Sequence, residues 1–226
     1  MGLMHPKRGE SDMAGGFAAL LRGRIGEELS FSGYQFERAN TEEDRIAAYR
    51  FRHRVFLEEG FIDPGDFKDE LFTDQFDETS EHILVYSEDR ELVGTTRFVC
   101  PSKIGFPTEH LFDFDEPDVA RDRLGEFGRL AIDSEHRGDK RYPMLGMIKM
   151  VYECILERSI SHIYAFMPAM LVESYTALGL VSHRLDSRPP TKVILNRRAG
   201  MRGYFERNEI QAVLFSLREM EDEVGV

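Results

Sequence analysis

The amino-acid sequence predicts an α/β fold in which helices flank a mixed β-sheet. Two strand-like segments joined by a short polar turn occupy the first half of the chain, and this pattern is typical of a β-hairpin. Two strand–helix units follow in the second half. Strands and helices that alternate in this way build an α/β layer structure, and the hairpin that precedes them makes the sheet mixed.

Length and composition favour one globular domain. Of the 226 residues, 42% are hydrophobic and 11% aromatic, which is ample for a core. We expect residues 1–28 to be a loose leader and residues 29–226 a single domain, with a strand and a helix in 191–223 as an extension. No apolar run approaches the roughly 20 residues that span a bilayer, and the leader lacks the apolar core of a signal peptide. A cytoplasmic protein without an integral membrane segment is therefore expected.

Charge and cysteine content narrow the classes of partner. A formal net charge of −12 argues against nucleic-acid binding, and an acidic protein partner would need a local basic patch. The two cysteines, Cys100 and Cys154, lack the spacing of metal ligands. The sequence predicts neither a metal site nor a disulfide framework.

The first half of the domain opens with a strand, a helix and a hairpin. Alternating aromatic residues in Phe31–Arg38 favour a strand. Thr41, followed by three acidic residues, is typical of a helix N-cap, and Gly60 ends the helix that it opens. An acidic loop follows, and then the predicted hairpin of His82–Ser87 and Leu92–Cys100.

The second half is centred on a strand, a charged loop and a helix, all within Leu124–Leu156. Apolar residues in this helix recur at three- and four-residue steps, which is the period of an amphipathic helix. The preceding stretch, Pro101–Arg123, is predicted to be irregular. The remaining predicted elements are a strand at His162–Met167, a helix at Pro168–Leu178, a strand at Thr191–Arg197 and an amphipathic helix at Glu209–Glu223.

Two ionisable residues, Glu126 and Arg129, lie within the central strand. Because they are three positions apart, their side chains should leave an extended strand on opposite faces. Charged side chains are seldom buried in an apolar strand without a role. We therefore expect the two residues to belong to a functional site.

Short motifs in a fixed order resemble those of the acyl-homoserine lactone (autoinducer) synthases. They are RHRVF at Arg52–Phe56, DQFD at Asp74–Asp77, TRF at Thr96–Phe98, EFGR at Glu126–Arg129, Tyr142-Pro143, HIYA at His162–Ala165 and PAML at Pro168–Leu171. The resemblance covers Glu43 to Leu185. Long-chain N-acyl amino acid synthases and the acyltransferases of exosortase systems are similar to this family, and Glu157–Leu171 resembles these two groups most.

The resemblance implies the fold of the Gcn5-related N-acetyltransferases (GNAT) and an acyltransferase activity. It implies Glu126 as the base that takes a proton from the attacking amine, with Asp77 as the alternative base and Arg129 as the partner of the buried Glu126 carboxylate. Substrate-binding roles are expected for Arg52, Phe56, Asp74, Arg97, Phe98, Phe127, Met144, Ile148 and Phe166. Of these, Phe98, Phe127, Met144, Ile148 and Phe166, together with Leu130 and Met167, would line a tunnel for a long acyl chain.

Departures from the family pattern point to the substrates. Phe72 stands where autoinducer synthases have Glu, and Phe61 or Ile62 replaces their Trp; the loss of a carboxylate disfavours cationic S-adenosylmethionine and favours an amino acid as acceptor. Lys140 and Tyr142 interrupt the glycine-rich phosphate loop of acetyltransferases. This disfavours coenzyme A and favours acyl carrier protein as the donor.

No tightly bound cofactor is expected, and the co-substrate is the phosphopantetheine thioester of acyl carrier protein, or acyl-coenzyme A. The acidic carrier protein would dock on four cations, Arg137, Lys140, Arg141 and Lys149. The favoured activity is the synthesis of an N-acyl amino acid from a small amine or amino acid. Two alternatives stay open: an autoinducer synthase that uses S-adenosylmethionine, and a non-catalytic module that binds acyl chains or carrier protein.

Overall fold

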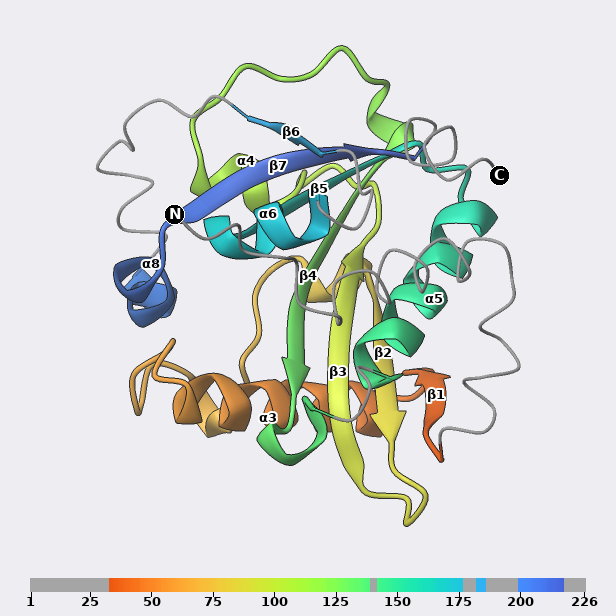
Figure 1. Ribbon diagram of the computed structural model, residues 1–226, viewed down its shortest axis with the longest axis vertical. Helices are drawn as coiled ribbons and strands as arrows, with labels where there is room; N and C mark the ends of the chain where they lie inside the picture. The colour runs from red at the N-terminus through yellow and green to blue at the C-terminus, as the bar shows by residue number, and fades with distance from the viewer. Residues whose placement is uncertain (1–32, 139–141, 177–181, 186–198, 218–226) are drawn as a thin grey trace, which may run out of the picture.

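The computed structural model describes residues 33–138, 142–176, 182–185 and 199–217. Seven strands in these ranges form one mixed sheet in the order β1-β2-β3-β4-β5-β7-β6 (Figure 1). The pairing of β4 with β5 is parallel, and the other neighbouring strands are antiparallel. The strands are β1 (Gln35–Arg38), β2 (Ser80–Tyr86), β3 (Leu92–Val99), β4 (Leu124–Ile132), β5 (His162–Pro168), β6 (Ser182–Arg184) and β7 (Ile210–Ser216). The predicted α/β class and the hairpin of β2 and β3 are confirmed.

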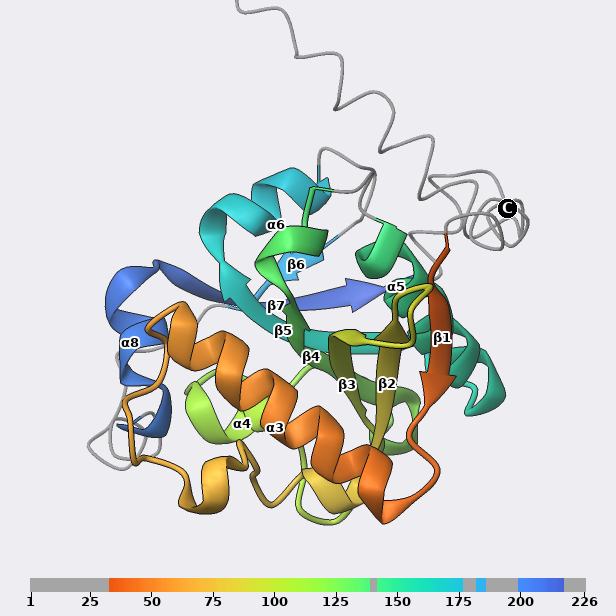
Figure 2. The same cartoon turned by 90° about the horizontal axis from the view of Figure 1, so that it is seen from below.

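Helices cover both faces of the sheet (Figure 2). Helix α3 (Glu42–Glu58) packs on β2, β3 and β4, and α5 (Tyr142–Glu157) packs on the opposite face of the same strands. Between α5 and the sheet, Met147 and Val151 pack in an apolar cluster with Ile83 and Val85. The other helices of the described ranges are α4 (Pro107–Leu111), α6 (Ala169–Thr176) and α8 (Arg202–Arg207).

Helix α3 begins and ends where the sequence predicts. The Thr41 side chain accepts a hydrogen bond from the Asp44 backbone N–H, and the Asp44 side chain accepts one from the Thr41 N–H, which completes a capping box. After the helix, Gly60 takes a φ of 66°. A Cβ on Gly203 would clash with the Gly60 carbonyl oxygen, so α8 packs directly against this turn.

Strands β4 and β5 pair at their beginnings and then diverge (Figure 1). Leu124–Glu126 of β4 pairs with His162–Tyr164 of β5. Beyond these residues β4 stays paired with β3, and β5 stays paired with β7. The sheet is therefore split between β4 and β5, and within the described ranges these two strands do not pair with each other beyond Glu126 and Tyr164.

A β-bulge in β4 changes the direction of the Arg129 side chain. Thr95 pairs with Ala131 whereas Arg97 pairs with Gly128, so β4 has one extra residue between these pairs. Arg129 takes a φ of 57°, a left-handed conformation that is uncommon for residues other than glycine. The bulge shifts the alternation of side chains by one, and Arg129 lies on the face of the sheet that carries Arg97 and Glu126. The prediction of opposite faces for Glu126 and Arg129 is wrong for this reason.

The C-terminal helix predicted at Glu209–Glu223 is wrong over Ile210–Ser216, which forms β7. This strand lies between β5 and β6, and most of its side chains are buried. A strand covered on both faces has a continuous apolar run, which periodicity alone does not distinguish from a buried helix.

Helices α4 and α8 and strand β6 were not predicted. The predicted strand at Thr191–Arg197 and the leader 1–28 lie outside the described residues.

Candidate functional site

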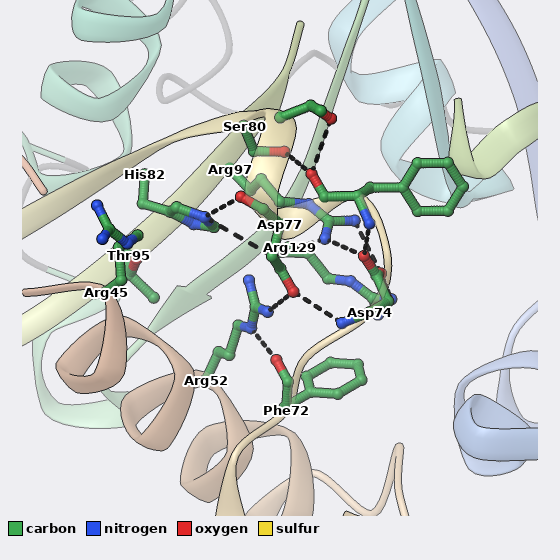
Figure 3. A network of polar contacts seen from close by, with 12 residues as sticks. Arg45, Arg52, Phe72, Asp74, Asp77, Ser80, His82, Thr95, Arg97 and Arg129 are labelled. Atoms are coloured by element: carbon green, nitrogen blue, oxygen red, sulfur yellow. Dashed lines mark hydrogen bonds and ion pairs between the residues drawn. The ribbon is translucent and has the colours of Figure 1, made fainter. Parts of the chain in front are cut away.

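A mostly buried cluster of three arginines and two aspartates lies between α3 and the sheet (Figure 3). Arg52 of α3 and Arg97 of β3 are 1% and 2% exposed, and both bind Asp77, at 2.7 Å and 2.8 Å. Asp77 also accepts a hydrogen bond of 2.7 Å from the Asp74 backbone N–H. The acidic loop is thus fixed to the sheet by the ion pairs of Asp77 with Arg52 and Arg97.

Asp74 joins the second part of this cluster. It binds Arg97 at 2.6 Å and Arg129 at 2.9 Å. The Arg129 guanidinium lies 4.1 Å from the centroid of the Phe72 ring. Its Nη1 is 2.7 Å from Sδ of Met201, and a thioether is a weak acceptor. Arg129 therefore pairs with Asp74, and the predicted pair of Arg129 with Glu126 is not formed.

The cluster carries one more positive than negative charge at neutral pH. Burial raises the pKa of Asp74, but the charges of Arg97 and Arg129 outweigh burial and hold this pKa far below its usual range. The pKa of Asp77 is lowered in the same way by Arg97 and Arg52. Burial lowers the pKa of the neighbouring His82 to about 4, so that its imidazole is neutral. The excess positive charge favours an anionic group beside Arg129.

Glu126 is buried on the same face, at 1% exposure. Its Oε2 accepts a hydrogen bond of 2.9 Å from the backbone N–H of Thr108, at the beginning of α4. Burial raises the pKa of the Glu126 carboxyl to about 8, and the hydrogen bond from Thr108 only partly offsets this. Glu126 is therefore largely protonated at neutral pH, and it holds α4 against β4.

Replacement of Glu126 by Gln should change how stability depends on pH. Between its ordinary pKa of about 4.3 and a folded-state pKa of about 8, the folded protein holds a proton that the unfolded chain has lost. The free energy of unfolding of the wild type should therefore fall as pH rises through this window, by up to about 1.4 kcal/mol per pH unit from this group. Glu126→Gln should lack this contribution. Urea unfolding of both proteins at several pH values between 5 and 8 measures the difference, and a difference that is constant over this range would contradict the assignment.

Three adjoining cavities lie beside these residues. The charged cavity, of about 410 Å³, is lined by Phe72, Asp74, Gln75, His110, Leu111 and Arg129, among others. The splay cavity, of about 200 Å³, lies between the diverging strands and is lined by Phe127, Leu130, Ala165, Phe166, Met167 and Leu171, among others. The outer cavity, of about 210 Å³, is lined by Val55, Phe56, Glu59, Phe61, Leu130, Ala131, Ile132 and Arg137.

The splay cavity is in contact with both of the others. Arg129 and Met201 line it together with the charged cavity. Phe56, Phe61 and Leu130 line it together with the outer cavity. A charged compartment and an apolar compartment thus meet at Arg129. Within the described part of the chain, Glu126 lines none of the three cavities.

Some of the residues that were predicted to line an acyl tunnel line one cavity together, and their binding of an acyl chain stays a prediction. Phe127, Leu130, Phe166 and Met167 line the splay cavity, and so does Phe56. Three other predicted residues lie elsewhere: Phe98 is fully buried in the cluster beneath α5, Ile148 packs against that cluster, and Met144 lies on α5. Because α5 covers the solid part of the sheet rather than the split, its side chains fill a core and not a tunnel.

The two predicted carrier-binding cations that the structure describes form ion pairs within the chain. Arg137 forms an ion pair with Glu59 and donates to the Ile132 carbonyl at 2.9 Å. Lys149 lies 3.3 Å from Glu153, one turn along α5. Lys140 and Arg141 lie outside the described residues, and so does the side chain of Tyr175, for which core packing is expected. Carrier binding at these cations stays a prediction.

The sequence did not single out His110 and Met201, which both line the charged cavity. His110 lies on the short helix α4, in a stretch predicted to be irregular, and no motif marks it. In the described ranges, no group of side chains has the composition of a metal site, and no helix has the length and apolarity needed to cross a bilayer.

Comparison with known proteins decides the family. No protein with a curated description matches the sequence. The sequence model of one family, described as "N-acyl amino acid synthase FeeM", matches residues 47–193, more than half of the chain. The chain belongs to this family. The description of the family agrees with the acyltransferase activity that the sequence motifs imply.

Solved structures share the fold of this FeeM-family chain. The autoinducer (AHL) synthase LasI is 17% identical with a TM-score of 0.58, over 84% of this chain and 93% of that chain. FeeM from uncultured soil microbes is 14% identical with a TM-score of 0.58, over 84% and 94%. The coenzyme A-dependent acyl-homoserine lactone synthase BjaI is 21% identical with a TM-score of 0.56, over 86% and 90%. Fold and family together identify an N-acyltransferase with a GNAT-like fold.

Proposed function

We propose that this protein transfers a long-chain acyl group from the phosphopantetheine thioester of acyl carrier protein to the amino group of an amino acid. The observation that carries the proposal is the meeting of the apolar splay cavity and the charged cavity at Arg129. A transfer between an acyl thioester and a charged acceptor needs two such compartments with one shared boundary. The family description, N-acyl amino acid synthase, supports an amino acid as the acyl acceptor.

The donor occupies the splay and outer cavities. Phe127, Phe166 and Met167 offer apolar surface to the acyl chain. The outer cavity continues from Leu130 to Ile132 and Arg137, where β4 ends. A phosphopantetheine arm that follows this path brings its single phosphate close to Arg137. Arg137 can bind the phosphate if it gives up its ion pair with Glu59.

The acceptor occupies the charged cavity. The carboxylate of an amino acid compensates the excess positive charge of the cluster by binding Nη1 of Arg129. Phe72 and Leu111 offer apolar surface beside it. A cationic acceptor would add a further positive charge beside Arg129, and the cavity has no carboxylate in the position of Phe72 to compensate it.

The split between β4 and β5 supplies the oxyanion donors. The amine nitrogen attacks the thioester carbonyl carbon, and negative charge develops on the carbonyl oxygen. Backbone N–H groups of β4 beyond Glu126 that point toward the split are not paired with β5. Such fixed donors stabilise the oxyanion before the carbon–sulfur bond breaks.

The test is a competition between donors and acceptors. The purified protein is given tetradecanoyl-carrier protein or tetradecanoyl-coenzyme A, with either the proteinogenic amino acids or S-adenosylmethionine, and products are identified by mass spectrometry. An N-tetradecanoyl amino acid from the carrier protein is expected, and Lys140→Glu with Arg141→Glu should slow it most at low salt. A lactone from S-adenosylmethionine would replace the proposed acceptor, and a preference for the coenzyme A ester would replace the proposed donor.

Leu171→Trp should shift the preference toward shorter acyl chains. Leu171 lines the splay cavity from α6 and is 42% exposed, so a larger side chain fits without disturbing the core. A misfit of one methylene in an apolar pocket changes kcat/KM by about 10-fold or more, and a comparable loss is expected for the longest chains. The matched control is Met170→Trp, because Met170 is 69% exposed and does not line this cavity. Equal chain-length profiles for both variants would exclude the splay cavity as the acyl site.

A further inference from the structure

The charged cavity must contain a group that accepts a proton, because an amino acid at neutral pH carries an ammonium group that cannot attack a thioester. Two side chains with a proton-accepting atom and an acid–base function line the cavity in the described ranges, Asp74 and His110. Asp74 is a poor base, because Arg97 and Arg129 hold its pKa far below the usual range. Glu126, the base that the sequence predicts, does not reach the cavity.

The contacts of His110 orient its imidazole for this role. Its Nε2 lies 2.8 Å from the carbonyl oxygen of Ile104. Since a carbonyl oxygen can only accept, Nε2 carries the hydrogen, and in the neutral ring Nδ1 carries the lone pair. The exposed Gln75 side chain, which also lines the cavity, lies 3.4 Å from Nδ1, at the outer limit of a hydrogen bond. An ammonium group in the cavity can therefore displace this contact.

Helix α4 is fixed in a way that positions His110. The carboxyl of Glu126 accepts a hydrogen bond from the Thr108 N–H, two residues before His110. Glu109 accepts one of 3.0 Å from the Phe106 N–H and is itself bound by Arg121. The ring of Phe76 contacts His110 edge-on, with 5.1 Å between centroids. Glu126 is thus a positioning residue that acts through α4.

We propose that His110 is the catalytic base, and that its Nδ1 takes a proton from the ammonium group of the acceptor. The neutral amine then attacks the thioester carbonyl carbon, and a tetrahedral oxyanion forms. On its collapse the carbon–sulfur bond breaks, the amide nitrogen loses its second proton, and the thiolate takes up one proton to leave as a thiol. The proton on His110 passes to solvent, so that one amide, one thiol and one proton are formed. This inference rests on the proposed function.

The test compares two acceptors that differ in their need for a base. One is the amino acid that the wild type acylates fastest in the competition described above. The other is its 2-aminooxy analogue, whose nitrogen is already unprotonated at neutral pH. His110→Gln keeps an N–H that can donate to the Ile104 carbonyl but has no basic nitrogen. Its kcat with the amino acid should fall at least ~10²-fold, while its kcat with the aminooxy acid should stay within a few-fold of the wild type.

Controls separate this result from other causes. His183→Gln, on the exposed edge strand β6, should match the wild type with both acceptors. His110→Asn serves as a second variant if His110→Gln does not fold, and thermal unfolding checks both. Equal losses with both acceptors, or full activity with the amino acid, would overturn the role of His110. Failure of the wild type to acylate any amino acid would instead overturn the proposed function.

Discussion

Asp77→Ala should destabilise the protein by about 3–5 kcal/mol, because it leaves two buried guanidinium groups without their shared carboxylate. Arg52 and Arg97 both bind Asp77, at 2.7 Å and 2.8 Å, and both are almost fully buried. Arg97 retains Asp74. Among the contacts described, Arg52 retains a hydrogen bond to the Phe72 carbonyl and cation–π contacts with the Tyr49 and Phe72 rings, but no carboxylate. A loss of this size is a large part of the stability of a typical domain.

Urea unfolding at neutral pH measures the effect, and an exposed ion pair provides the control. Glu58→Ala removes one of the two carboxylate partners of Arg54 on the surface of α3, at 3.2 Å, and leaves the other, Asp133. Such pairs contribute about 0–1 kcal/mol. If Asp77→Ala costs no more than Glu58→Ala, the cluster does not hold the acidic loop and the assignment of its charges is wrong.

Arg129→Leu should lower kcat/KM for the amino acid acceptor by about 10²–10³-fold. Removal of one partner from a buried, hydrogen-bonded charge pair typically costs about 2–5 kcal/mol, and about 1.4 kcal/mol corresponds to a factor of 10. The loss should appear mainly in KM for the acceptor, because Arg129 lines the boundary of the charged and splay cavities and is the proposed partner of the acceptor carboxylate. The protein should remain folded, since Asp74 keeps two hydrogen bonds to Arg97.

Two comparisons sharpen this prediction. Arg129→Lys keeps the charge but not the planar group that also binds Asp74, so an intermediate loss is expected. The methyl ester of the same amino acid lacks the carboxylate and should be a poor acceptor for the wild type. With Arg129→Leu, the acid and the ester should be acylated at similar rates. A variant that still prefers the acid strongly would place the carboxylate elsewhere.

The sequence alone determined the elements that depend on neighbouring residues. The capping box of Thr41 and Asp44, the stop at Gly60 and the hairpin of β2 and β3 all follow from signals within a few positions. The order of the motifs from Arg52 to Leu171 also sufficed to indicate the family that comparison confirms. These signals are local or sequential, and folding does not alter them.

The tertiary structure decided the partners and the compartments. Arg129 binds Asp74, which is 55 positions away, because a single extra residue in β4 turns its side chain to the other face. Strand β7 replaces a predicted helix because β5 and β6 pair with both of its edges, and apolar clusters cover both of its faces. His110 lines the charged cavity and Glu126 does not, because of the way in which the five-residue helix α4 packs on β4. No periodic pattern in the sequence marks this helix. Such features depend on contacts between distant segments, and the free energy of those contacts overrides the weak local preferences that a sequence displays.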